Sequence, residues 1–154
     1  MPTISLRLGI QGLSTTDALE FFGPTLQVGI RRHESDSTTE TGGESGILQM
    51  RYLALIDTGA RDSGIDSTLA EELGLVHAED VERRAVGILG VGFVDVYLAQ
   101  ISIPELGFSI AGRFPGVHLA EGGQPYRALI GRDILTNFAM VYDGRSGTVT
   151  LSNE

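Results

Sequence analysis

The chain of 154 residues contains no cysteine. This absence excludes disulfide bridges, thiol catalysis and zinc–thiolate sites. Basic residues are also scarce, because 11 Lys and Arg stand against 20 Asp and Glu and leave a formal net charge of −9. Such a surplus of negative charge argues against nucleic acid and against anionic membrane surfaces as partners.

Long apolar segments and metal-ligand patterns are lacking as well. The longest nearly apolar run extends from Ala85 to Val94, contains three glycines and is too short to span a membrane. The N-terminus has no basic flank followed by an apolar signal core. His33, His77 and His118 do not have the spacing of a metal site. We therefore expect a soluble, cytoplasmic protein that needs neither metal nor cofactor.

The length and the turn-forming residues together predict the fold class. A chain of this size is expected to form a single domain overall. Its 21 glycines separate short β-rich runs, helical periodicity occurs only in brief pieces, and no internal repeat is visible. This pattern predicts an all-β barrel or sandwich.

Individual elements follow from periodicity and turn signals. Leu26, Val28 and Ile30 alternate as on a half-buried strand. The segment 14–24 fits either a helical turn or an extended chain, and its Phe21–Phe22 bond is a candidate for self-cleavage. Residues 34–46 are polar and are expected to form a hairpin loop rather than a domain boundary. Strands are expected over 3–10, 25–33, 47–56, 108–119 with a break at Pro115–Gly116, and 127–130; hairpins over 86–103, with its tip at 87–92, and over 140–151; helices over 68–73, capped by Asp66 or Ser67, and over 132–138.

The sequence Asp57-Thr58-Gly59-Ala60 is the strongest functional signal in the chain. It follows the apolar run 52–56, so a strand is expected to end in a tight turn that presents one carboxylate. Asp and Gly favour turns in any case, so the tripeptide alone is weak evidence. A second segment, 128–135 (Ala-Leu-Ile-Gly-Arg-Asp-Ile-Leu), can pass close behind this turn.

A turn of this kind suits acid–base hydrolysis of an amide. Two carboxylates about 3 Å apart share one proton, so one can activate a water while the other polarises the carbonyl. The chain offers one suitable turn: Asp62 lies too near Asp57 in sequence to face it, and Asp143 lacks the following hydroxyl residue. The second carboxylate must then be Asp57 of another copy, which predicts a homodimer.

These segments resemble the retropepsin-like (retroviral-type) aspartic proteases, and in particular their single-lobe bacterial and cellular members. The resemblance covers roughly residues 25–152 and rests on Leu55 to Ala60, the glycine-rich segment 87–93 and the segment 129–135. It implies a closed β-barrel lobe with one or two short helices and a glycine-rich flap hairpin. Residues 25–154 would form the protease domain, and residues 1–24 an N-terminal extension or strand.

The resemblance also implies roles for individual residues. Asp57 would be catalytic. Arg61 departs from the pattern, since viral members often carry an acidic residue there. An arginine at this position cannot make the same contacts to the substrate backbone, nor the same ion pair near Arg132, as an acidic residue would. The catalytic turn would be supported by Thr58, Gly59, Ile130 and Gly131, and the substrate-binding residues would be Ala60, Arg61, Ile88, Leu89, Gly90 and Gly92.

The sequence thus favours an aspartic endopeptidase that cleaves extended peptides around apolar residues, using a water activated between two Asp57 carboxylates of a homodimer. The alternative is a catalytically idle, dimeric peptide-binding module of the same fold, which would hold a peptide by β-augmentation. A monomeric β-domain with a scaffolding role is the third possibility. The substitution Asp57→Asn separates the first two, because it should abolish cleavage but leave binding in place.

Overall fold

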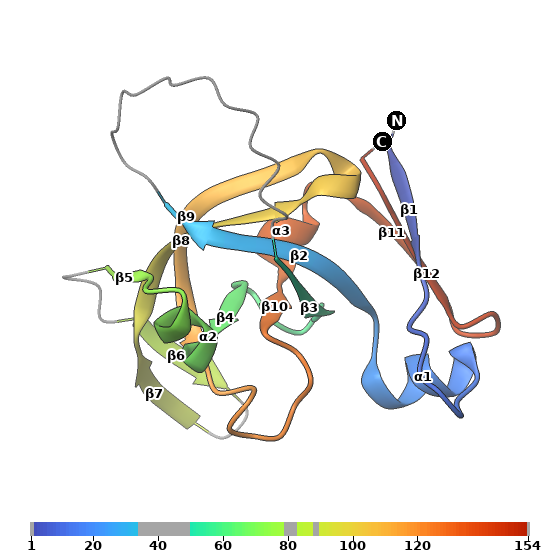
Figure 1. The fold of residues 1–154 in the computed structure, drawn as a ribbon, viewed down its shortest axis with the longest axis horizontal. Helices are drawn as coiled ribbons and strands as arrows, with labels where there is room; N and C mark the ends of the chain where they lie inside the picture. The colour runs from blue at the N-terminus through green and yellow to red at the C-terminus, as the bar shows by residue number, and fades with distance from the viewer. Residues whose placement is uncertain (1, 34–49, 79–82, 88–89, 154) are drawn as a thin grey trace.

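The computed structural model describes residues 2–33, 50–78, 83–87 and 90–153. Strands dominate this part of the chain, and the helices are short (Figure 1). In chain order the elements are β1 Thr3–Leu6, α1 Thr15–Phe22, β2 Thr25–Arg32, β3 Arg51–Ile56, β4 Gly64–Asp66, α2 Ser67–Glu72, β5 Val76–His77, β6 Arg83–Gly87, β7 Gly90–Val94, β8 Val96–Ile103, the 3₁₀ turn η1 Pro104–Leu106, β9 Phe108–Val117, β10 Ala128–Ile130, α3 Arg132–Leu135, β11 Ala139–Asp143 and β12 Thr148–Ser152.

Six strands close into a barrel. Their order is β2-β3-β10-β4-β9-β8, and β8 pairs with β2 to complete the ring. β5 pairs with Tyr97 and Leu98, near the start of β8. Most of these pairs are antiparallel, but β10 runs parallel to β3 and β4 runs parallel to β9. The all-β barrel expected from the sequence is confirmed.

The barrel interior is filled by alternate side chains of its strands. Leu26, Val28 and Ile30 of β2 are all buried, which confirms the period-two pattern expected for that strand. Ile56 and Ile130 are buried on the adjacent strands β3 and β10. The apolar core therefore lies directly behind the ends of β3 and β10.

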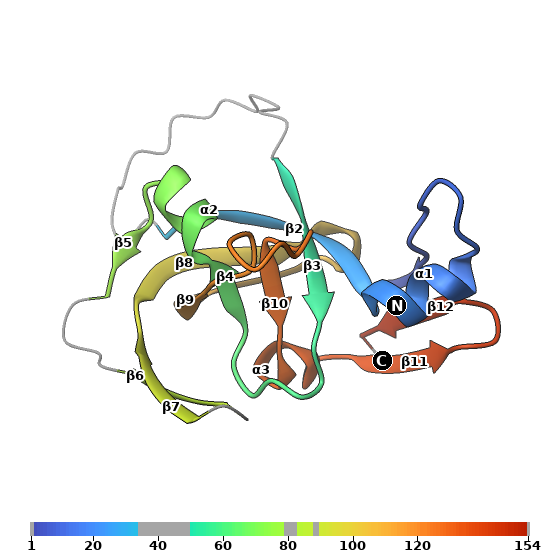
Figure 2. The ribbon, with the colours of Figure 1, turned by 90° about the horizontal axis from the view of Figure 1, so that it is seen from below.

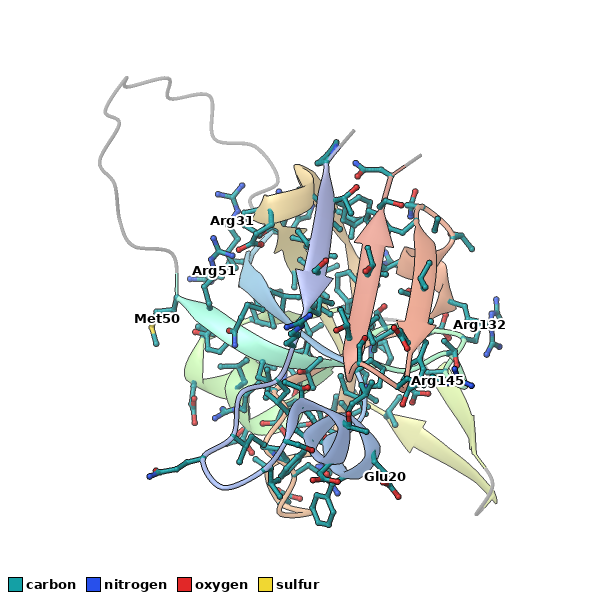
Figure 3. All side chains as sticks on the ribbon, turned by 90° about the vertical axis from the view of Figure 1, so that its right-hand side faces the viewer. Glu20, Arg31, Met50, Arg51, Arg132 and Arg145 are labelled. Atoms are coloured by element: carbon teal, nitrogen blue, oxygen red, sulfur yellow. The ribbon has the colours of Figure 1, made fainter. Side chains whose placement is uncertain are left out.

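A second sheet lies beside the barrel and is built from both ends of the described chain. β1 pairs with β12, and β12 pairs with β11, all antiparallel; Figure 3 shows this three-stranded sheet from its outer side. The expected C-terminal hairpin is present and runs from the Ala139–Ser152 pair to the Asp143–Thr148 pair. β1 ends at Leu6, earlier than expected, because its pairing with β12 ends there.

Three short α-helices are described, one more than expected. The segment 14–24, which fits either a helical turn or an extended chain by sequence, forms α1. Ser14 caps this helix by accepting a hydrogen bond from the main-chain N–H of Asp17. The Phe21–Phe22 bond therefore lies in a helix rather than in an extended segment. α2 starts after its cap Asp66, as expected, and α3 is shorter than expected, ending at Leu135.

Two further expectations were wrong. The predicted hairpin over 86–103 is divided between two sheets, because β6 pairs with β7 whereas β8 joins the barrel and pairs with β9. β9 also continues through Pro115–Gly116. Proline is tolerated there because β9 changes partner at this point, from β8 up to Pro115 to β4 at Gly116.

Within the described ranges, helices are too short or too polar to cross a membrane. The same part of the chain brings together no group of three or more His, Asp or Glu that could hold a metal ion.

Candidate active site

The Asp57 turn leaves the end of β3 and folds back on itself. The Asp57 carboxylate accepts hydrogen bonds at Oδ1 from the main-chain N–H of Gly59, at 2.9 Å, and of Ala60, at 3.2 Å. The Ala60 N–H also lies 3.1 Å from the Asp57 carbonyl oxygen. The side chain is thus held in one direction by its own turn. Asp57 is partly exposed, and Thr58 and Gly59 are exposed, so solvent and ligands can reach the carboxylate.

β10 lies alongside β3 and supports the turn from behind. Leu129 and Ile130 pair in parallel with Leu55 and Ile56, and the Asp57 N–H donates to the Ile130 carbonyl at 2.9 Å. The hydrogen-bond ladder between β3 and β10 therefore extends as far as Asp57 itself. The loop from β3 to β4 lies next to α3, which follows β10 (Figure 2).

Gly131 allows this close approach. A Cβ atom at this position would lie 2.8 Å from the Asp62 carbonyl carbon and 3.0 Å from the Ser63 nitrogen. Both are main-chain atoms of the loop after the Asp57 turn, so a larger residue would push the two segments apart. The structure thus places Ile130 and Gly131 directly behind the turn.

Three hydrogen bonds tie the following residues to this loop. The Arg132 N–H donates to the Ala60 carbonyl at 3.0 Å, and the Asp133 N–H donates to the Arg61 carbonyl at 3.1 Å. The Arg132 guanidinium donates through Nη1 to the Thr58 carbonyl at 2.7 Å. Arg132 therefore holds the main chain of the turn, and both Arg61 and Arg132 are exposed (Figure 3 labels Arg132).

Ser63 and Asp133 form a second connection that the sequence reasoning missed. The Ser63 hydroxyl donates to the Asp133 carboxylate at 2.6 Å and accepts from the Gly131 N–H at 2.9 Å. The Ser63 N–H also donates to both Asp133 carboxylate oxygens at 3.0 Å. The signal in the sequence was an acidic residue in the first turn of a helix after Gly131, but its partner is 70 residues away.

Two other aspartates, Asp66 and Asp143, have their carboxylates engaged away from the turn. Asp66 is fully buried, accepts hydrogen bonds from the N–H groups of Leu69, Leu119 and Ala120, and lies 3.5 Å from Arg127 Nε. It therefore fixes the loop before β10. Asp143 belongs to the turn between β11 and β12.

The glycine-rich segment forms a separate hairpin. β6 and β7 pair from Arg83–Val94 to Gly87–Gly90, so Gly90 and Gly92 lie on β7. Ile88 and Leu89, also expected to bind substrate, lie outside the described residues. Figure 2 shows this hairpin and the β3–β4 loop on the same side of the barrel.

Comparison with solved structures gives the fold. A retropepsin-like aspartic protease from Rickettsia conorii superposes with a TM-score of 0.53 at 14% sequence identity, over 97% of this chain and 89% of that one. This similarity shows that the chain has the retropepsin-like fold, as the sequence resemblance implied.

Two further structures match less well. The EIAV protease, in complex with an inhibitor, has a TM-score of 0.48 at 19% identity and covers 73% of this chain and 85% of its own. The retroviral protease-like domain of Ddi1 from Leishmania major has a TM-score of 0.44 at 17% identity, over 82% of this chain and 88% of that one. No protein-family model and no curated protein sequence matches the chain.

Proposed function

We propose that the chain is an aspartic endopeptidase that acts as a homodimer and hydrolyses extended peptides around apolar residues. The observation that carries this proposal is the Asp57 carboxylate, which is held by its own turn and supported by β10 within a retropepsin-like fold. The turn is also partly exposed, as a site that admits substrate must be.

The reaction requires a second carboxylate. With Asp57 of a second copy across a two-fold axis, the two groups would share one proton and hold the attacking water between them. The outer edge of β11 favours such an assembly, because Val141 is 62% and Tyr142 is 52% exposed there. In the described part of the chain β11 is the last strand of its sheet, and exposed apolar side chains on such an edge strand are typical of a surface that another chain covers.

The remaining site residues would bind and enclose the peptide. In this proposal Thr58 and Gly59 shape the catalytic turn, which Ile130 and Gly131 support from behind. The β6–β7 hairpin acts as a flap that closes over the peptide and excludes water. Residues 25–154 form the protease domain and residues 1–24 its extension. The peptide would be bound by Ala60, Arg61, Ile88, Leu89, Gly90 and Gly92.

The test is incubation of the purified protein with a mixed peptide library, from about pH 4 to about pH 7, beside Asp57→Asn. The expected result is cleavage by the wild-type protein alone, next to apolar residues. The variant should keep the wild-type far-UV circular dichroism spectrum, since it preserves the hydrogen-bond acceptor of the turn. Cleavage by both proteins would overturn the role of Asp57. Retention of peptides by both proteins, without cleavage, would instead establish the idle peptide-binding module.

A further inference from the structure

An exposed apolar surface with acidic groups lies on α1, outside the barrel. We call it the α1 patch, and it consists of Leu13, Asp17, Glu20, Phe21 and Phe22, which line a hollow of about 610 Å³. The Phe21 side chain is 80% exposed and Leu13 is 43% exposed. A phenylalanine that exposed on an ordered helix leaves a large apolar area in water, and such areas mark interaction surfaces.

Helical spacing explains why the patch combines apolar and acidic groups. Asp17, Glu20 and Phe21 lie at positions i, i+3 and i+4 and therefore share one side of the helix. Ala18 and Leu19 are buried and hold the opposite side against the molecule. Glu20 lies on the outer side of α1 in Figure 3. The exposed side is thus a consequence of how the helix is packed, and it is presented to solvent as a unit.

The patch has a fixed shape because both ends of α1 are anchored. Ser14 caps the first turn, and the Thr15 hydroxyl donates to the Ser146 carbonyl at 3.1 Å. At the other end the Tyr126 hydroxyl donates to the Phe22 carbonyl. A surface that is already ordered loses little conformational entropy when it binds a partner.

The charges of the patch select the partner. Among the described residues, the polar groups that line the hollow are Asp17 and Glu20, and none of the described Arg or His side chains lines it. A second copy placed symmetrically on the same patch would oppose these carboxylates to one another, which is unfavourable for like charges. We propose that the α1 patch binds a protein segment in which apolar side chains alternate with arginine or lysine: the apolar groups would contact Leu13 and Phe21, and the cations would pair with Asp17 and Glu20.

This binding surface lies away from the β6–β7 hairpin. α1 and the β6–β7 hairpin lie at opposite ends of the molecule in both ribbon views (Figures 1 and 2). A segment bound at α1 would therefore leave this hairpin free and could tether a protein for cleavage or for another purpose. Binding at the α1 patch does not depend on whether the chain cleaves peptides.

The experiment uses the full chain carrying Asp57→Asn, so that no probe can be cut whether or not the wild-type protein is active. Fluorescence anisotropy is measured for a panel of labelled peptides of about ten residues, which combine Leu or Phe with Arg, and for matched peptides in which Glu replaces Arg. Binding is compared with that of Phe21→Ser, Glu20→Gln and Asp17→Asn. Val76→Ser is the matched control, since Val76 is also 50% exposed but lies on β5.

We expect the Arg-containing peptides to bind, and Phe21→Ser to weaken binding by about tenfold or more. Glu20→Gln and Asp17→Asn should each weaken peptide binding by about threefold. Added salt should also weaken peptide binding, because it screens the charges. Val76→Ser should have no effect, and the thermal unfolding midpoint should show that every variant is folded. Equal binding of the Glu-containing peptides, no binding by any peptide of the panel, or insensitivity to Phe21→Ser would overturn the proposal. Dissociation of a dimer by Phe21→Ser in sedimentation velocity would also overturn it, because a second copy would then cover the patch.

Discussion

At the scale of single residues, Ser63 connects the two halves of the site. Its side chain is completely buried, and its hydroxyl both donates to Asp133 and accepts from the Gly131 N–H. A buried donor or acceptor that loses its partner costs free energy because water cannot replace the lost bond. The stability of the Asp57 turn is thus coupled to a hydroxyl group six residues further along the chain.

Ser63→Ala should lower the free energy of unfolding by about 1–3 kcal/mol, since it removes the two hydrogen bonds of the hydroxyl and leaves the Gly131 N–H without its acceptor. Urea denaturation measures this loss, and any peptidase activity should fall with it, because the loop beside the Asp57 turn loosens. Ser5→Ala, at an exposed position of β1, is the control and should change stability by less than about 0.5 kcal/mol. A Ser63→Ala protein as stable as the control would contradict this account.

Gly131→Ala should destabilise the protein by about 1–3 kcal/mol, because the added methyl group would collide with main-chain atoms that cannot rotate away. The nearest atom would be the Asp62 carbonyl carbon, 2.8 Å from the new Cβ. Gly112→Ala is the matched control, since its Cβ would meet nothing nearer than the Phe114 ring at 3.9 Å. Thermal unfolding of the two variants tests the difference, and equal midpoints would refute the close packing of Gly131.

At the scale of elements, the turn between β11 and β12 is organised by one carboxylate. The pKa of Asp143 is lowered from its usual 3.8, first by the hydrogen bond from the Ser146 hydroxyl and then by the N–H groups of Ser146 and Arg145. The main-chain carbonyls of Ser146 and Arg145 in the same turn accept hydrogen bonds from the Thr15 and Thr16 hydroxyls and so anchor α1. This turn therefore links the C-terminal hairpin to the helix that carries the α1 patch.

The lowered pKa of Asp143 makes the turn sensitive to acid. A carboxyl group whose pKa is lower in the folded chain contributes stability that is fully present above its unfolded pKa and is lost as the pH falls through the folded value. Asp143→Ala should therefore be less stable than wild type at neutral pH, and the difference should shrink below about pH 4. Thermal unfolding midpoints measured across this range check the trend. Ser146→Ala should reduce the same pH dependence, and a difference that grows with acid would rule out the hydrogen bonds as its cause.

At the scale of the whole molecule, the proposed chemistry needs two chains. Each contributes one Asp57, so a mixed dimer with one Asn would lack the second carboxylate. The molecule carries a formal charge of −9, which opposes association at long range. Added salt should therefore favour the dimer by screening this repulsion.

Mixing tests this requirement directly. When wild-type protein exchanges subunits with an equal amount of Asp57→Asn, random pairing places about half of the wild-type chains in mixed dimers, and activity per wild-type chain should fall to about half. Asp95→Asn, at an exposed position, is the control and should leave activity unchanged. Activity that is unaffected by Asp57→Asn would mean that one chain suffices.

Much of the fold could be predicted from local patterns. The alternation of β2, the cap of α2 at Asp66 and the C-terminal hairpin each depend on residues close in sequence, and the structure has all three. The errors arose where a distant partner decided the outcome. Pro115 stays within β9 because β4 takes over the pairing, and β8 joins the barrel because β2 and β9 flank it.

In the candidate site too, local patterns could be predicted from the sequence and contacts between distant residues could not. The sequence singled out Asp57 with its neighbours Thr58 and Gly59, because a turn after an apolar strand is a local pattern. It did not single out Ser63 and Asp133, because nothing in the sequence indicates that a serine and an aspartate 70 residues apart form a hydrogen bond. The apolar segment around Phe21 and Phe22 is expected from the sequence to be exposed, and Phe21 is indeed 80% exposed. Only the structure shows that this segment is the end of a helix.

The sequence by itself determined the strand-rich composition, the single Asp-Thr-Gly turn and the apolar segment that can support it, because these depend on residue type and short-range spacing. Only the tertiary structure decided which strands close the barrel, which main-chain groups hold the Asp57 turn, and which side of α1 faces water. These features depend on contacts between segments far apart in the chain, and their free energy is gained only when the whole barrel has formed.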